Sequence, residues 1–157
     1  MTANASSTET PTTKIPAAAL WLTAAGFLPF ALFSLGTVAA PPMHQHKLEI
    51  ALLLYGAVIL SFLGGIHWGY EMARKSVETD SPSFTRLGLS VLPSLAAWGS
   101  LALPQPYGAV GLSVSLLLTL AYDIICVQRG YMPKWYPKLR APVTLAVVAS
   151  LLLPYAI

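Results

Sequence analysis

Three ionisable side chains lie within long apolar stretches of this chain. His67 and Glu71 occur in SFLGGIHWGYE (residues 61–71), and Asp123 occurs in AYDIICVQRG (residues 121–130). Ionisable groups in a membrane-spanning segment are costly and usually face a bundle interior or water. A histidine that titrates near neutral pH beside carboxylates suits proton transfer. The same groups also suit hydrogen bonds that hold helices together, and the residue types alone leave both interpretations open.

The position of each group along its apolar stretch places His67 and Asp123 at one depth. Each lies seven residues before a helix-ending signal, at Arg74 and at Gly130, which corresponds to about 10 Å along a helix axis. We therefore expect the two side chains to lie close together, with further charged groups nearer the surface. The predicted intramembrane polar cluster consists of His67, Glu71, Asp123 and Arg129.

The sequence lacks the residues that a disulfide, a metal site or a known catalytic motif would require. Cys126 is the only cysteine, so no internal disulfide is expected, and inside an apolar run it acts as a small hydrophobe. His44 and His46 supply two metal ligands, whereas a structural zinc site typically needs four. The sequence holds no Gly-rich phosphate loop, HExxH or G-x-S-x-G motif, and no second histidine in a span that would complete axial haem ligation. We predict no catalytic residue, no metal site and no cofactor.

The elements that position these groups are predicted to be membrane helices. The chain is 55% hydrophobic and 10% charged, whereas a soluble domain is about 25% charged. Apolar runs of about 20 residues are typical of transmembrane helices. We predict an all-α polytopic membrane protein: a polar, disordered tail at residues 1–15, then one domain at residues 16–157, with five transmembrane helices over residues 16–40, 48–72, 87–103, 107–127 and 141–157.

The basic residues predict the orientation of these helices, since Lys and Arg accumulate in cytoplasmic loops. With five spans, one side holds eight of the nine cations and the other holds only Lys47. The N-terminus is therefore expected inside and the C-terminus outside, and the positive charge is better explained by topology than by nucleic-acid binding. The eight cations are Lys14, Arg74, Lys75, Arg86, Arg129, Lys134, Lys138 and Arg140.

Small residues recur every four positions in the second and fourth spans, a spacing that lets helix backbones approach closely in lipid. We predict that these rows face the bundle, together with Gly64, and that Tyr55, Ile59, Phe62, Ile66 and Tyr70 face lipid. Aromatic residues near the charged helix ends are predicted to be interfacial anchors. The rows are Ala57, Ser61, Gly65 and Gly69, and Gly111, Ser115 and Thr119; the anchors are Trp68, Tyr131, Trp135 and Tyr136.

Two long segments carry a resemblance to a known family. YGAVILSFLGGIHWG (residues 55–69) and AYDIICVQRGYMPKWYPKLRAPVT (residues 121–144) are similar to domain-of-unknown-function family 3429 (DUF3429), which is related to transmembrane protein 69 of animal mitochondria. The stretch GFLPF (residues 26–30) fits the first helix of that family. The resemblance implies a small multi-span inner-membrane protein without an established activity.

These observations favour a non-enzymatic membrane component, with a structural, assembly or accessory role. The alternative is a small proton-coupled transporter or channel that uses His67, Glu71 and Asp123; a membrane enzyme acting on a lipid or quinone is a more distant third. The expected partners are the lipid bilayer, other membrane proteins or a second copy, and no nucleic acid. Because residues 1–15 lack the Arg-rich character of a mitochondrial transit peptide, a bacterial inner membrane is favoured over a mitochondrial one.

Overall fold

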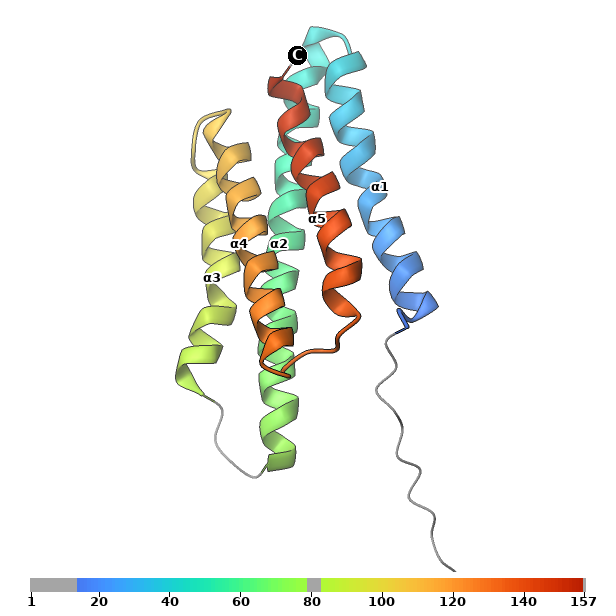
Figure 1. Cartoon of the computed structure of the whole chain (residues 1–157). Helices are drawn as coiled ribbons and strands as arrows, with labels where there is room; N and C mark the ends of the chain where they lie inside the picture. Colours follow the sequence, from blue (N-terminus) through green and yellow to red (C-terminus); the bar gives the residue numbers. More distant parts are fainter. Residues whose placement is uncertain (1–13, 79–82, 157) are drawn as a thin grey trace, which may run out of the picture.

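The computed structural model describes residues 14–78 and 83–156, with the side chains of residues 75–78 left undescribed. Residues 1–13 of the predicted polar tail lie outside this range. The described residues form five α-helices and a final 3-10 turn (Figure 1). Their bounds are α1 Ala17–Ala39, α2 Pro42–Glu78, α3 Phe84–Leu101, α4 Tyr107–Gln128, α5 Tyr136–Leu152 and η1 Leu153–Tyr155.

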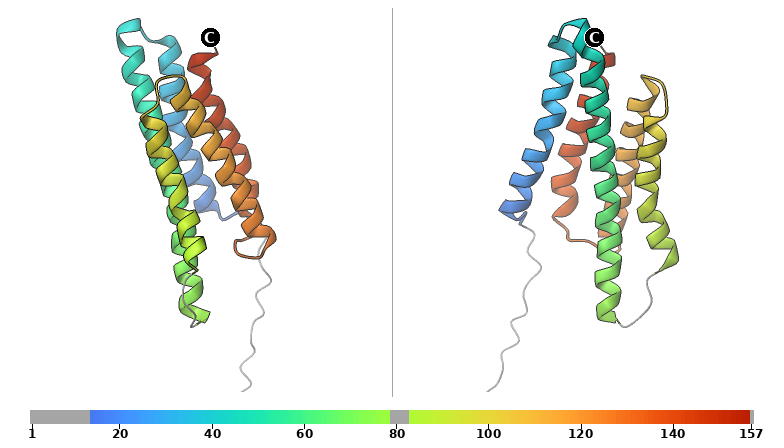
Figure 2. Two further views of the ribbon diagram at one scale, coloured as in Figure 1. Left: turned by 90° about the vertical axis from the view of Figure 1, so that its left-hand side faces the viewer. Right: turned by 180° about the vertical axis from the view of Figure 1, so that it is seen from behind.

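The helices form one up-and-down bundle in which α2 is central. Successive helices run antiparallel, with α1 and α5 on one side of α2 and α3 and α4 on the other (Figures 1 and 2). Helix α2 contacts each of the other four helices. The groups on its buried face can therefore meet side chains from all parts of the bundle.

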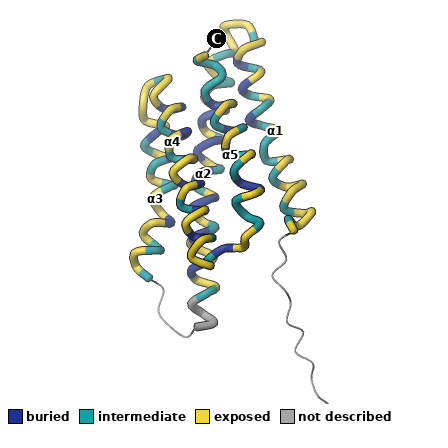
Figure 3. The backbone as a smooth tube through the Cα atoms, viewed as in Figure 1, coloured by how far each residue is buried: buried dark blue, intermediate teal, exposed yellow. Residues whose placement is uncertain are grey.

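The apolar residues divide between a core and an outer surface. Leu52, Leu60, Leu112 and Leu116 are buried at the centre, together with Phe30 from α1. Exposed residues occur all along the outside of the bundle (Figure 3). Many of them are large and apolar, as a lipid-facing surface requires. Among the described residues, four helical segments are long and apolar enough to cross a membrane: Ala17–Ala39, Pro42–Arg74, Tyr107–Gln128 and Tyr136–Tyr155. The predicted all-α membrane architecture is confirmed at this level. Helix α3, the third of the five predicted spans, is not among these four segments.

Three helices begin earlier than predicted: α3 by three residues, and α2 and α5 by more. Helix α2 starts at Pro42, a residue type suited to the first helical turn, so His44 and His46 lie in a helix instead of a loop. Helix α5 starts at Tyr136, five residues before the predicted span. The hydropathy pattern missed its first turn because Lys138 and Arg140 interrupt the apolar run. As a result Arg140, predicted to be a loop cation, is a buried helical residue.

The end of α4 is fixed by Gly130, as the sequence predicts. Gly130 has φ of +75°, the left-handed conformation that glycine adopts without strain. Its backbone N–H donates to Val127 at 3.0 Å, and that of Tyr131 donates to Cys126 at 2.8 Å. This pair of bonds is a Schellman cap. It ends α4 and turns the chain toward α5, which carries Arg140.

The predicted inner face of α2 is wrong in its second half. Gly65 and Gly69 are exposed, and a Cβ atom at either position would meet no atom within 4 Å. A row of residues spaced by four drifts about 40° per step around a helix of 3.6 residues per turn. The row that starts on the buried side at Ala57 therefore reaches the outside by Gly69, with Ser61 half-buried between them.

The observed buried stripe of α2 alternates steps of three and four residues. It comprises Leu53, Ala57, Leu60, Gly64, His67 and Glu71. The side predicted to face lipid is also partly wrong: Tyr55 donates a hydrogen bond to the Gly26 carbonyl at 2.9 Å, and Ile59 and Ile66 pack partly against the core. Phe62 and Tyr70 are exposed.

Candidate functional site

A buried carboxylate joins three helices near one end of the bundle. Asp123 of α4 is fully buried. Its Oδ1 lies 2.7 Å from His67 Nε2 of α2, and its Oδ2 accepts a hydrogen bond from Arg140 Nε of α5 at 3.4 Å. The predicted contact between His67 and Asp123 is therefore present, and Arg140 joins it. We call His67, Asp123 and Arg140 the polar triad.

Each member of the polar triad lies on the buried stripe of its helix. His67 follows Gly64 on α2, where a Cβ atom would collide with the Ser90 carbonyl oxygen of α3; glycine at this position therefore lets α3 approach closely. Asp123 is one turn beyond Thr119, which is also buried. Arg140 begins the α5 stripe that continues through Thr144, Val147 and Leu151.

The charges of the polar triad limit what it can do. An ionised carboxylate only accepts hydrogen bonds, so His67 must carry a proton on Nε2 when it bonds to ionised Asp123. The guanidinium of Arg140 supplies one positive charge against the one negative charge of Asp123. With neutral His67 the triad has no net charge, which suits a buried site where an unpaired ion would be costly.

Glu71 belongs to a different network at the end of α2. Its carboxylate accepts hydrogen bonds from the Ser83 backbone N–H at 3.1 Å and from Arg86 Nη1 at 3.3 Å, and lies 3.7 Å from Arg74 Nη2. Arg86 also donates to the Tyr131 hydroxyl at 2.7 Å and stacks over its ring, with 4.1 Å to the centroid. These contacts tie α2 to the start of α3 and to the α4–α5 loop.

The predicted four-residue cluster is therefore divided. His67 and Asp123 form part of the polar triad, Glu71 pairs with the arginines near the helix ends, and Arg129 is exposed at the C-cap of α4. Arg129 is six residues after Asp123. At about 100° per residue, this separation rotates it about 240° around the helix axis from Asp123. Arg129 therefore points away from the side of α4 that carries Asp123. Arg140 takes the place predicted for Arg129. Only one sequence pattern indicates that Arg140 faces the bundle, namely the helical spacing of Arg140, Thr144, Val147 and Leu151.

The other predicted rows and anchors have mixed outcomes. In α4, Gly111 faces the Ser100 side chain of α3, Ser115 is half-buried and Thr119 is buried, so this row faces the bundle as predicted. Trp68 is exposed on the outer surface. Tyr131 packs with Arg86 and Arg74, and Trp135 and Tyr136 are half-buried beside a cavity.

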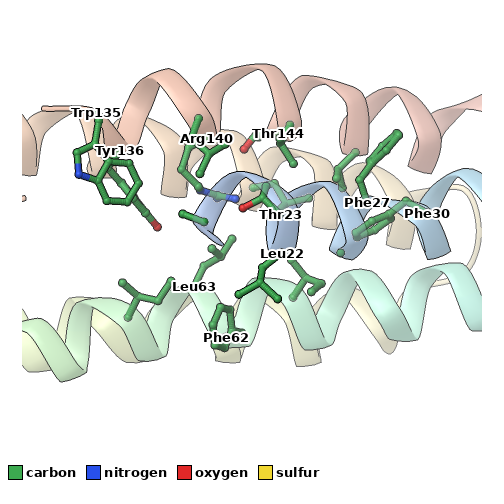
Figure 4. A pocket seen from close by; sticks show the side chains of 18 residues that line it. Leu22, Thr23, Phe27, Phe30, Phe62, Leu63, Trp135, Tyr136, Arg140 and Thr144 are labelled. Carbon is green, nitrogen blue, oxygen red and sulfur yellow. The ribbon is translucent and has the colours of Figure 1, made fainter. Parts of the chain in front are cut away.

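Two cavities lie on different sides of the polar triad. The first, of about 250 Å³, lies between α1, α2 and α5 and is lined by Arg140, Thr144, Trp135 and Tyr136 among mainly apolar residues (Figure 4). The second, of about 210 Å³, lies between α3 and α4 and is lined by His67 with Ser115, Thr119 and Tyr122 among apolar residues. Arg140 and His67 thus each border a different cavity, with Asp123 bonded to both.

Metal-ligating side chains do not gather anywhere in the described part of the chain. No group of three or more His, Cys, Asp and Glu residues is close enough to hold a metal ion there. His46 lies 3.9 Å from Glu49 of the same helix, and Cys126 is buried.

Comparison with known proteins gives a family without a described activity. The model of the family described as "Protein of unknown function (DUF3429)" matches residues 15–156. Transmembrane protein 69 of Xenopus tropicalis is 33% identical over 144 residues, which cover 87% of this chain and 53% of that protein. Transmembrane protein 69 of Mus musculus is 28% identical over 142 residues, covering 86% and 54%. No solved structure matches the chain. The chain spans about half the length of these curated relatives, and the match of the family model over nearly all of its residues places it in the DUF3429 family.

Proposed function

We propose that this member of the family is a five-span, non-enzymatic membrane component with a structural, assembly or accessory role. One observation carries the proposal: the fully buried Asp123 is bonded to both His67 and Arg140. A carboxylate that joins three helices serves to fix the bundle. The internal charges then hold the fold, and the outer surface is the part that meets other molecules.

The outer face of α2 supports this role. Gly65 and Gly69 form a GxxxG pair with open space above both residues. In lipid, such pairs allow a second helix to approach the backbone closely. The closed polar triad inside and the glycine face outside together fit a subunit that is held rigid and packs against a helix of another chain or of a second copy.

The five-span topology of the proposal depends on α3. Its 18 residues correspond to about 27 Å of helix, close to the bilayer core of about 30 Å. Arg86 in its first turn has partners in Glu71 and Tyr131, which lowers the cost of placing that end near the headgroups. The excess of cations on one side supports an N-terminus inside and a C-terminus outside, in a bacterial inner membrane.

The experiment that tests this role is purification from native membranes in mild detergent. We expect stoichiometric membrane proteins, or a second copy, to co-purify with the wild-type chain and to be lost from Gly65→Leu and Gly69→Leu. Leu145→Phe is the matched control, because it also enlarges an exposed side chain but lies on α5, away from the glycine pair. A wild-type preparation that is strictly monomeric and contains no partner protein contradicts an assembly role.

A second function, proton-coupled transport, is favoured by one observation. His67 and Arg140 border separate cavities and share Asp123, so a proton could pass from one cavity to the other at this point. Reconstituted vesicles containing a pH-sensitive dye test this function. Proton flux in wild-type vesicles that is abolished by Asp123→Asn would favour transport, provided that the variant remains folded.

A further inference from the structure

We propose that the cavity between α1, α2 and α5 is a lipid-binding site. It would take one acyl chain with an oxyanion head, and Arg140 and Thr144 would bind the head. This proposal goes beyond the role in assembly and does not depend on it. It assigns a ligand to a site that borders the polar triad without breaking its bonds.

The cavity exists because only the second half of α1 packs against the bundle. The buried residues of α1 are Phe30, Ser34 and Thr37, while the first turns, including Leu22, are mostly exposed. Figure 1 shows α1 diverging from α2 toward its N-terminal end. The space between the diverging helices holds the 250 Å³ cavity.

The walls of this cavity are almost entirely apolar. Phe27 and Phe30 stand at one end and Trp135 and Tyr136 at the other, with Arg140 between them (Figure 4). The volume is below the roughly 300–1,000 Å³ of pockets that enclose drug-sized ligands. The cavity therefore suits part of a long molecule, such as a segment of an acyl chain below its head.

Two unpartnered polar atoms lie in the cavity wall. Arg140 is 8% exposed and Thr144 is 1% exposed, yet Arg140 Nη2 and Thr144 Oγ1 have no hydrogen-bond partner in the described part of the chain. Arg140 uses Nε for Asp123, so the outer edge of its guanidinium remains available. Buried donors are normally satisfied, and these two belong to one helix face, four residues apart.

The chemistry of these atoms selects the head of the ligand. A guanidinium forms charge-assisted hydrogen bonds to carboxylate and phosphate oxygens, and a neighbouring hydroxyl can donate to the same group. Arg140 lies four residues after the start of α5, which is about 6 Å along the helix. That depth suits a headgroup whose chain extends toward the centre of the bilayer.

The cavity is reached from the side of the bundle that would face lipid. Leu22 of α1 is 74% exposed and Phe62 of α2 is 64% exposed, and both line the cavity. A membrane lipid can therefore enter between α1 and α2 without passing through water. Fatty acids and anionic phospholipids share the required chemistry, and they are distinguished by experiment.

Quenching of Trp135 by brominated chains tests the site. Trp21, Trp68 and Trp98 are replaced by Phe, so that fluorescence reports only on the residue at the cavity. The protein is placed in nanodiscs of saturated phosphatidylcholine and titrated with 9,10-dibromostearic acid or with phosphatidylglycerol carrying dibrominated chains. We expect saturable quenching by one of these two probes, reversed by its unbrominated analogue, and the probe that saturates identifies the source of the chain.

Three variants give the test its controls. Thr144→Val removes the hydroxyl without changing shape and should raise the half-quenching concentration by roughly three- to tenfold. Val143→Phe fills the cavity and should abolish saturation, whereas Leu145→Phe, on the exposed side of the same helix, should leave it unchanged. Unaltered thermal unfolding of each variant shows that it remains folded.

Three outcomes overturn the proposal. Quenching that rises linearly with probe and is equal in Val143→Phe and Leu145→Phe means contact with bulk lipid only. Equal half-quenching concentrations for wild type and Thr144→Val mean that the polar atoms bind no head. Saturable quenching by ubiquinone, with none by either brominated chain, assigns the cavity to a quinone.

Discussion

His67 Nε2 and Asp123 Oδ1 lie 2.7 Å apart, although 56 residues separate them in the chain. The contact forms because both residues occupy the buried stripe of their helices at one depth, and both helices run in the same direction. Arg140 approaches the other carboxylate oxygen from α5. Asp123 therefore has two partners, and its loss should have larger consequences than the loss of either partner.

A double-mutant cycle between His67 and Asp123 should show coupling. His67→Leu is expected to lower the free energy of unfolding by about 1–3 kcal/mol, because it strands a buried polar group. Asp123→Leu also breaks the buried ion pair with Arg140 and should cost at least the roughly 3–5 kcal/mol typical of such a loss. The double variant should be less damaging than the sum of the two. Chemical unfolding in detergent measures these differences, and strictly additive losses would reject an energetic link between the pair.

Arg140→Met should be among the most damaging single substitutions. It removes the cation that balances the fully buried Asp123, and breaking a buried ion pair typically costs about 3–5 kcal/mol. Arg129→Met is the matched control, since Arg129 is exposed and surface changes usually stay within about 0.5 kcal/mol. Thermal unfolding of the two variants under one detergent condition compares them. Equal shifts in Tm would contradict the role given to Arg140.

The neighbouring glycines Gly64 and Gly65 should respond in opposite ways to alanine. A Cβ at position 64 collides with the Ser90 carbonyl oxygen of α3, so Gly64→Ala should destabilise the bundle by separating two helices. A Cβ at position 65 meets nothing within 4 Å, and Gly65→Ala should be neutral or stabilising by up to about 1 kcal/mol through helix propensity. If both variants unfold at the same temperature, the buried stripe of α2 is misplaced.

The accuracy of the sequence-based predictions follows from the kind of information each one used. Hydropathy identified the helices, and the depth of His67 and Asp123 within their spans predicted a contact that does not depend on exact helix phase. The inner face of α2 does depend on phase, and a strict spacing of four residues drifted out of the core by Gly69. The burial of Arg140 is not predicted, because a basic residue normally marks the end of a membrane span. The cavity lies where α1 diverges from α2 beside α5, which no local pattern encodes.

The topology of the chain depends on whether α3 crosses the membrane. A charge at Arg86 lowers its hydropathy, yet α3 packs alongside α2 and α4 through most of its length (Figure 2). Gly64 of α2 faces Ser90 and Pro93, and Gly111 of α4 faces Ser100, so the close approaches extend from the middle of α3 to its C-terminal end. A helix held along two spanning helices in this way is expected to span as well.

The number of spans determines the side on which each terminus lies. Five spans place the two termini on opposite sides, whereas four place them on the same side. Alkaline phosphatase and green fluorescent protein fusions to the C-terminus of the full chain in a bacterial host distinguish these cases. We expect phosphatase activity without fluorescence at the C-terminus, and a fusion in the loop at Lys134 to behave in the opposite way. A fluorescent C-terminal fusion would contradict the five-span topology, since α2 and α4 run in the same direction (Figure 1) and can both span only if α3 crosses between them.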